Sequence, residues 1–220
     1  MKSRYTVSSS FFATLLFLAI VLLATASQSW ALQFSNDPND PSLASATLYD
    51  FNTDPIGFFA SKDFGDFTVN TLSYTITRMR IDDTYAGRYG TSGRYLDAPF
   101  SRVFSFDVVF DDPVRAYGFS IGAVDYDWRV SYLDTVGNLL GTLTVDNSAR
   151  YGKYYTASIS GGQNPISRVV FTRVSRADWI MFDNFKYTPA TTAPVPEPAT
   201  VLLMGVGLAG FAGFQYRKKV

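Results

Sequence analysis

Apolar and polar residues alternate in short runs between residues 46 and 187. The segment 103–110 places Phe104, Phe106, Val108 and Phe110 on one face, and the same spacing recurs in 117–121 and 128–132. A period of two is typical of strands that bury one face, and the abundance of aromatic and β-branched residues favours strands as well. Further strands are predicted at 46–51, 67–80, 139–145, 154–159, 166–174 and 179–187. No helical periodicity longer than two turns is evident in this part of the chain.

Turn-forming residues separate these segments. The clearest turns are predicted at 111–113 (Asp-Asp-Pro), 136–138 (Val-Gly-Asn) and 161–165. About nine strands at this spacing predict an all-β domain at 32–188, an antiparallel β-sandwich that is jelly-roll-like. A closed barrel is the competing architecture. A linker of small residues and prolines follows at 189–194.

Residues 1–31 have the pattern of a secretory signal peptide. Lys2 and Arg4 form a positive start, 11–24 is apolar, and small residues follow. Ala26 and Ala31 each end a small–x–small cleavage site. We favour cleavage by signal peptidase after Ala31, because a short polar spacer then separates the site from the apolar run. An uncleaved membrane anchor is the alternative.

The C-terminal segment 195–220 has the features of a membrane signal. An uncharged apolar stretch with several glycines predicts a transmembrane helix at 199–216, since membrane helices tolerate glycines that soluble helices penalise. The basic residues Arg217, Lys218 and Lys219 predict the membrane stop. By the positive-inside rule they stay in the cytoplasm, which leaves the main domain outside.

The triplet Pro196-Glu197-Pro198 stands directly before this apolar stretch. Triplet, glycine-rich helix and basic end together resemble the PEP-CTERM sorting family of Gram-negative bacteria that make exopolysaccharide. The resemblance implies that an exosortase, a membrane-embedded processing enzyme, recognises the triplet and cleaves near it. It also implies a transient inner-membrane anchor, followed by release or transfer to the cell surface or extracellular matrix.

The body of the chain resembles the same proteins more loosely. The segment 179–187 resembles the closing strand of their exported jelly-roll domains. Modules of that kind often hold a structural calcium ion where the first and last strands meet, so the resemblance implies a calcium site at Asp50 and Asp183. Carboxylate oxygens suit such a hard cation. The alternative is that both residues are ordinary turn or surface aspartates, and no other cofactor is predicted.

The composition excludes several kinds of chemistry. The 220 residues include no Cys and no His, which excludes disulfides, thiol nucleophiles and histidine-based triads or metal sites. Because Glu197 is the only Glu, a glycosidase built on a Glu pair is excluded, whereas an Asp pair is not. Asp125, Asp127 and Asp178 are conceivable for a surface polysaccharide hydrolase, but no motif marks a pair. We therefore predict a protein without catalytic residues and keep the hydrolase as the alternative.

The formal net charge of zero conceals an acidic body. Without the five basic residues of the two terminal segments, 14 basic residues remain against 19 acidic ones. The arginines of this body are scattered singly. A nucleic-acid-binding protein needs a basic face, so that class is excluded.

Tyrosines are concentrated in two segments that we expect to be loops. The six candidates for ligand binding are Tyr85, Tyr89, Tyr95, Tyr151, Tyr154 and Tyr155. Exposed tyrosines beside Gly, Ser and Arg offer flat apolar faces with hydrogen-bonding rims, which suit sugars or a protein partner. The alternative is that these rings only cover the edges of the sandwich. Our hypothesis is a structural or adhesive protein that contacts exopolysaccharide.

Overall fold

The computed structural model describes residues 32–72, 78–98, 105–160, 164–176 and 178–190. The predicted signal peptide (1–31), the last part of the predicted linker (191–194) and the predicted transmembrane helix (199–216) lie outside these ranges. Inside them, no helix has both the length and the apolar character that crossing a membrane requires. The predicted all-β, antiparallel fold is confirmed. The strands are β1 (Gln33–Ser35), β2 (Thr47–Tyr49), β3 (Gly57–Phe59), β4 (Ser61–Asp63), β5 (Phe67–Thr71), β6 (Met79–Asp82), β7 (Tyr95–Ala98), β8 (Ser105–Gly122), β9 (Trp128–Leu133), β10 (Leu139–Val145), β11 (Lys153–Ser158), β12 (Ile166–Arg173) and β13 (Ile180–Pro189), with 3-10 helices η1 (Pro41–Leu43) and η2 (Asn147–Ala149).

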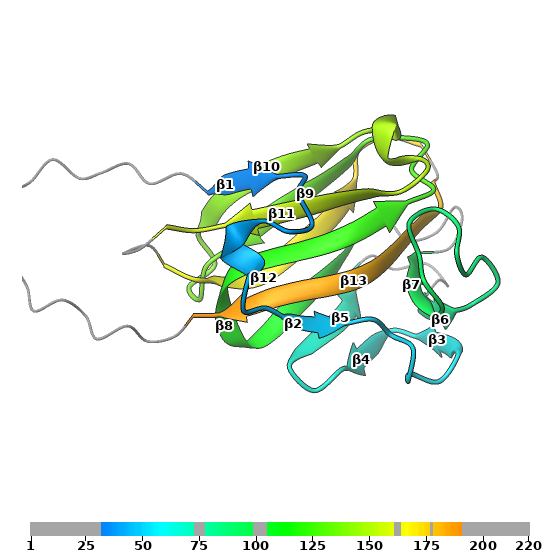
Figure 1. Cartoon of the computed structure of the whole chain (residues 1–220), viewed down its shortest axis with the longest axis horizontal. Coiled ribbons are helices and arrows are strands. Elements are labelled where there is room, and N and C mark those ends of the chain that lie inside the picture. Colours follow the sequence, from blue (N-terminus) through cyan, green and yellow to red (C-terminus); the bar gives the residue numbers. More distant parts are fainter. Residues whose placement is uncertain (1–31, 73–77, 99–104, 161–163, 177, 191–220) are drawn as a thin grey trace, which may run out of the picture. The chain divides into compact units, whose positions relative to one another are not determined.

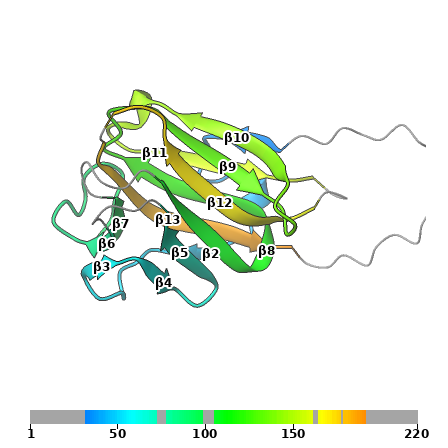
Figure 2. The ribbon, with the colours of Figure 1, turned by 180° about the vertical axis from the view of Figure 1, so that it is seen from behind.

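The strands form two layers that face each other (Figures 1 and 2). In the first layer the order is β4, β5, the first half of β8, β12, β9 and β10. In the second layer β13 lies between β7 and the second half of β8, and β11 and β1 follow beyond β8. Among the described strands β10 pairs only with β9, so the arrangement is an open sandwich and the barrel alternative is wrong.

The strand β8 runs through both layers, which corrects one prediction. The predicted turn at 111–113 does not end a strand, because β8 continues from Ser105 to Gly122. Val109 of β8 pairs with Arg168 of β12, whereas Val114 pairs with Ile166. The pairing register shifts between these positions, so β8 bends there and enters the other layer. Pro113 has no N–H to leave unpaired at such a corner.

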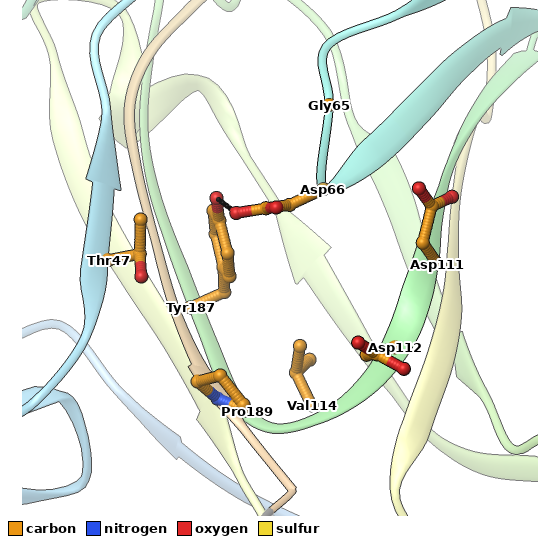
Figure 3. Close-up of a pocket in the computed structure, with 8 residues that line it drawn as sticks. All are labelled: Thr47, Gly65, Asp66, Asp111, Asp112, Val114, Tyr187 and Pro189. Carbon is orange, nitrogen blue, oxygen red and sulfur yellow. Dashed lines mark hydrogen bonds between the residues drawn. The ribbon is translucent and has the colours of Figure 1, made fainter.

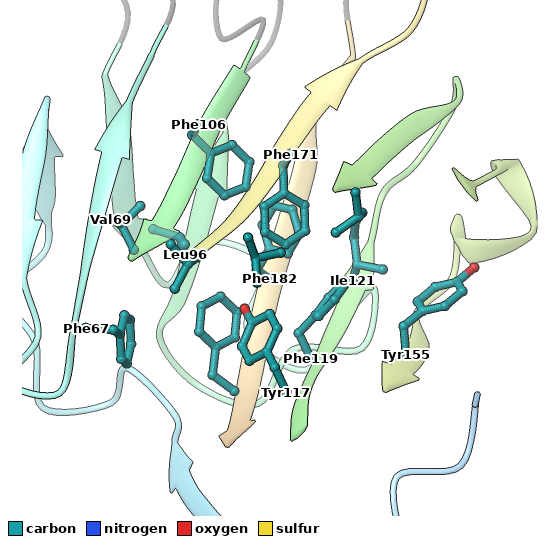
Figure 4. Packing of buried hydrophobic residues seen from close by; sticks show 14 of the residues in the cluster. Phe67, Val69, Leu96, Phe106, Tyr117, Phe119, Ile121, Tyr155, Phe171 and Phe182 are labelled. Carbon is teal, nitrogen blue, oxygen red and sulfur yellow. The ribbon is translucent and has the colours of Figure 1, made fainter. Parts of the chain in front are cut away.

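Aromatic side chains fill the space between the layers (Figure 4). Phe106 and Phe171 of the first layer stack with ring centroids 4.6 Å apart, and Phe182 of the second layer meets Phe171 edge-on at 5.0 Å. Phe119 likewise contacts Phe171 at 5.2 Å. These residues occupy the alternate positions that the sequence pattern predicts to be buried. Offset and edge-on ring pairs add to the stability that burial provides.

The described chain begins and ends at the same end of the sandwich (Figures 1 and 2). Gln33 pairs with Ser158 and Pro189 pairs with Val114, close to where the chain enters and leaves. The loop between β6 and β7, residues 83–94, lies at the opposite end. The described chain therefore begins and ends at one end of the domain, and the loop 83–94 lies at the other.

Candidate functional site

Three of the six tyrosines proposed for ligand binding are buried, which corrects the expectation that all lie in exposed loops. Tyr95 begins β7 and is 0% exposed, and Tyr154 and Tyr155 belong to β11. The ring of Tyr155 faces the core and lies 6.0 Å from that of Phe119. Tyr154 faces the other way, and its hydroxyl would lie 2.6 Å from a Cβ at Gly118. For Tyr154 and Tyr155 the strand predicted at 154–159 is confirmed, and the expectation of an exposed loop is wrong.

The segments that carry the other three candidates meet at the end of the sandwich opposite to the one where the described chain begins and ends. Tyr85 and Tyr89 belong to the loop 83–94 and are half-buried, whereas Tyr151 is 80% exposed. The two segments touch through glycines, since a Cβ at Gly152 would lie 2.6 Å from the Gly90 nitrogen and 2.9 Å from the Tyr89 carbonyl carbon. The tertiary structure therefore joins two tyrosine segments that are about sixty residues apart in sequence.

Trp179 joins this group, although the sequence analysis did not identify it. The Tyr85 ring meets the Trp179 ring edge-on at 4.8 Å and lies 6.2 Å from the Tyr89 ring. We call Tyr85, Tyr89, Tyr151 and Trp179 the Tyr85 cluster. In the sequence Trp179 is the first residue of the last predicted strand, 179–187, and nothing in that position distinguishes it from a core residue.

A buried ion-pair network supports the Tyr85 cluster from β6 and β7. The Trp179 Nε1–H donates to Asp97, which is 0% exposed, and Arg80 donates to the same carboxylate through Nε at 2.9 Å. Arg80 also forms an ion pair with Asp82. Burial raises the pKa of Asp97 to about 6, against the opposing effect of Arg80. Burial would also raise the pKa of Asp82, but hydrogen bonds from Thr84 and Asp83 outweigh it and lower that pKa.

Asp50 directly follows β2, and β2 pairs with the part of β13 that follows Asp183. Asp183 is 0% exposed and accepts hydrogen bonds from the Ser92 N–H at 2.6 Å, the Ser92 hydroxyl at 3.1 Å and the Asn184 N–H at 2.7 Å. Burial raises the pKa of Asp183 to about 6, and the charge of Asp50 acts in the same direction. The carboxylate thereby anchors the loop 83–94. Within the described ranges no three acidic side chains are grouped as a metal site, and calcium binding stays a prediction.

The aspartates considered for hydrolysis do not form an open pair. Asp125 and Asp127 are exposed, and Asp125 forms an ion pair with Arg150 at 3.4 Å. Asp178 is buried, and burial raises its pKa. Its carboxylate accepts hydrogen bonds from the N–H groups of Asp125, Tyr126 and Trp179 and from Nε1 of Trp128. Asp178 therefore holds the turn between β8 and β9 against the start of β13.

Two cavities lie toward the end where the described chain begins and ends. One of about 220 Å³ is lined by Asp66, Asp111, Asp112 and Tyr187, among others, and the Tyr187 hydroxyl donates to Asp66 at 2.7 Å (Figure 3). The other, of about 320 Å³, lies beside β1 and η1 and includes Phe34. Neither cavity includes a residue that the sequence analysis proposed for ligand binding, metal binding or catalysis.

The C-terminal region carries the predicted sorting signal. A family model described as the PEP-CTERM protein-sorting motif matches residues 194–218. The resemblance inferred from the triplet, the apolar stretch and the basic end is thereby confirmed. The motif indicates an exported protein that is sorted by way of the membrane and processed by an exosortase. No curated protein matches the chain.

Several solved structures are similar to the sandwich at low identity. The K2 cleaved adhesin domain of Lys-gingipain has 10% identity and a TM-score of 0.39 over 65% of this chain and 99% of that chain. The family 11 carbohydrate-binding module of the cellulase Lic26A-Cel5E of Clostridium thermocellum has 12% identity and a TM-score of 0.34 over 66% and 95%. A glycoside hydrolase family 43 arabinoxylan arabinofuranohydrolase from Bacillus subtilis has 14% identity and a TM-score of 0.34, over 51% of this chain and 25% of that enzyme. Similarity at this level assigns neither ligand nor activity.

Proposed function

We propose that the sandwich is the exported cargo of the sorting motif and that the Tyr85 cluster contacts exopolysaccharide at the cell surface or in the extracellular matrix. In this proposal the role is structural or adhesive and involves no catalysis. The observation that carries it is the packing of the Tyr85, Tyr89 and Trp179 rings at one end of the sandwich, next to the segment that carries Tyr151, which the backbone contact at Gly152 brings there. That end lies opposite the end of β13, after which the sorting motif follows in the sequence (Figure 1).

The chemistry of the Tyr85 cluster suits a sugar chain. Aromatic rings present flat apolar faces to the C–H groups of a sugar, and phenol and indole groups supply hydrogen bonds at the rim. The loop that carries Tyr85 and Tyr89 is held at several points. Asp183 binds Ser92, and the Arg94 N–H donates to the Asn52 side chain at 2.9 Å. A surface held in this way loses little conformational freedom on binding.

Binding of the purified chain to the exopolysaccharide of the producing cells tests this proposal. Replacing Tyr85 or Tyr151 by alanine is expected to weaken retention about tenfold, which corresponds to ~1.4 kcal/mol. Val136→Ala is the matched control, because Val136 is apolar and 77% exposed but lies in the turn between β9 and β10, outside the Tyr85 cluster. No retention of the wild-type chain on any matrix glycan, with or without calcium, contradicts the proposal.

A surface hydrolase is the second candidate, and one observation favours it. Asp97 and Asp82 lie on adjacent strands beneath the Tyr85 cluster, and their pKa values shift in opposite directions. Such a divergence is what an acid–base pair uses. Both carboxylates are buried, at 0% and 4% exposed, so a glycan reaches them only if the Tyr85 cluster moves aside. Glycan turnover by the same protein preparation, abolished by Asp97→Asn alone, would replace the structural proposal with this one.

A further inference from the structure

Asp54 and Lys62 form an ion pair at the edge of the sandwich, apart from the Tyr85 cluster. Asp54 ends the turn that follows β2, and Lys62 lies on β4. The Lys62 Nζ is 3.1 Å from the Asp54 Oδ1, and the two side chains are 24% and 8% exposed. Two hydrogen bonds hold the Asp54 backbone. Its N–H donates to the Phe51 carbonyl, and its own carbonyl accepts from Arg94 Nη1 at 2.6 Å.

One side of this ion pair is aromatic. The Lys62 Nζ lies 5.1 Å from the centre of the Phe64 ring, and Tyr49 makes edge-on contacts with Phe64 at 5.6 Å and Phe67 at 5.3 Å. The amine must give up a proton before it can attack, and the Asp54 carboxylate 3.1 Å away is placed to receive it.

The Tyr49 hydroxyl donates a hydrogen bond to the other oxygen of the same carboxyl group, Asp54 Oδ2, at 2.7 Å. Burial and the neighbouring Asp54 raise the pKa of Tyr49 above its usual range, so the hydroxyl keeps its proton. A donor fixed on Oδ2 stabilises the negative charge that develops there when a nucleophile attacks Cγ. The three side chains thus present a nucleophile, an acyl carbon and an oxyanion donor in one place.

We propose that Lys62 and Asp54 join in an intramolecular isopeptide bond, with Tyr49 as the group that polarises the carboxyl. The Nζ–Cγ bond forms and the Cγ–Oδ1 bond breaks. Two of the three protons of the lysine ammonium leave with Oδ1 as water, and the third stays on the amide nitrogen. Oδ2 becomes the amide oxygen and keeps its hydrogen bond from Tyr49. The balance requires no oxidant, cofactor or second protein.

The crosslink would take the stabilising role that disulfides have in many exported domains. The chain is exported but contains no cysteine, so it has no disulfide to close its loops. An Asp54–Lys62 bond closes a ring from the turn after β2 to β4. Like a disulfide, it restricts the unfolded chain and leaves the folded one almost unchanged.

Peptide mapping of the full chain tests the proposal. Trypsin does not cut at an acylated lysine, so the denatured wild-type chain is expected to yield a peptide that runs uncut through Lys62 to Arg78, lighter than its sequence mass by one water. Further cleavage at Phe58 or Phe59 opens the ring, and the two fragments must then remain joined. A cyclic imide at Asp54 gives the same loss of water, but it needs the N–H of the next residue, and Pro55 has none.

Two variants separate the crosslink from the ion pair. Lys62→Arg keeps the charge but provides no amine, and its peptide is expected at full sequence mass. Tyr49→Phe keeps the ring and removes the polarising hydroxyl, so crosslinked peptide is expected to accumulate at least tenfold more slowly. Full sequence mass and complete cleavage at Lys62 in the wild-type chain, after prolonged incubation of the folded protein, overturns the proposal.

Discussion

Gly90 and Gly152 meet backbone to backbone, and this contact joins the two tyrosine segments of the candidate site. A Cβ at Gly90 would lie 3.0 Å from the Gly152 Cα, and a Cβ at Gly152 would lie 2.6 Å from the Gly90 nitrogen. Both residues have positive φ angles, +79° and +101°. Neither position therefore accepts a side chain without movement of the loop 83–94 or of the turn before β11.

Gly152→Ala is expected to destabilise the domain by roughly 2–3 kcal/mol, because it combines a strained φ with a clash against backbone atoms. Urea unfolding measures the change. Gly137→Ala is the matched control, since Gly137 has φ +87° but nothing within 4 Å of a Cβ. It is expected to cost about 1–2 kcal/mol. Equal costs at the two positions would show that the Gly90–Gly152 contact does not constrain the loop.

Trp179→Phe is expected to cost about 1–2 kcal/mol, because it removes the indole donor from the buried Asp97 carboxylate. It should also weaken glycan retention, since the ring beside Tyr85 is no longer held in place. Tyr85→Phe is the control, because it keeps the aromatic ring that packs against Trp179. Chemical denaturation and glycan sedimentation check both variants. Unchanged stability of Trp179→Phe contradicts a supporting role for Asp97.

Stability is expected to fall as the pH rises from about 4 to 6. Asp97 and Asp183 each have a folded pKa of about 6 against an ordinary value of 3.8. In that window the native state binds more protons than the unfolded chain, so the free energy of unfolding decreases as those protons leave. Above the folded pKa, the stabilisation that the protonated carboxyl groups provide is lost. The size is on the order of 1–3 kcal/mol for each group.

Unfolding measured across this pH range checks the sign. Asp97→Asn should flatten the decline, because the side chain no longer titrates. Asp112→Asn is the control, since Asp112 is exposed. The aspartates whose pKa is lowered, such as Asp82 and Asp146, titrate below 3.8 and act outside the window. A stability that rises steadily from pH 4 to 6 in the wild-type chain is the contrary result.

Replacing Pro196, Glu197 and Pro198 by alanine is expected to leave the chain in the membrane at its unprocessed mass, because the exosortase loses its recognition triplet. Cell fractionation and mass spectrometry of the mature termini check both location and cleavage. Thr192→Ala, just before the matched motif, is the control. Unchanged release of the triple variant contradicts the role of the triplet.

Local patterns predicted the strands better than they predicted the site. The segment 139–145 coincides with β10, and 166–174 exceeds β12 by one residue. The short strands β1, β3, β4 and β7 were missed, because three or four residues carry too little periodicity to stand out. The segment 67–80 corresponds to β5 and β6, with residues 73–77 between them outside the described ranges. Asp111-Asp112-Pro113 has turn chemistry, but it bends β8 from one layer to the other.

The sequence by itself determined the all-β fold and the sorting signal, because alternation along a strand and a contiguous C-terminal motif are local properties. Only the tertiary structure decided which tyrosines are available. It buried Tyr95, Tyr154 and Tyr155 and brought Tyr151 beside the loop that carries Tyr89. It also added Trp179 to the site and placed the Asp97 network beneath it. Burial and long-range contact depend on how strands pair, and strand pairing joins residues that no local pattern connects.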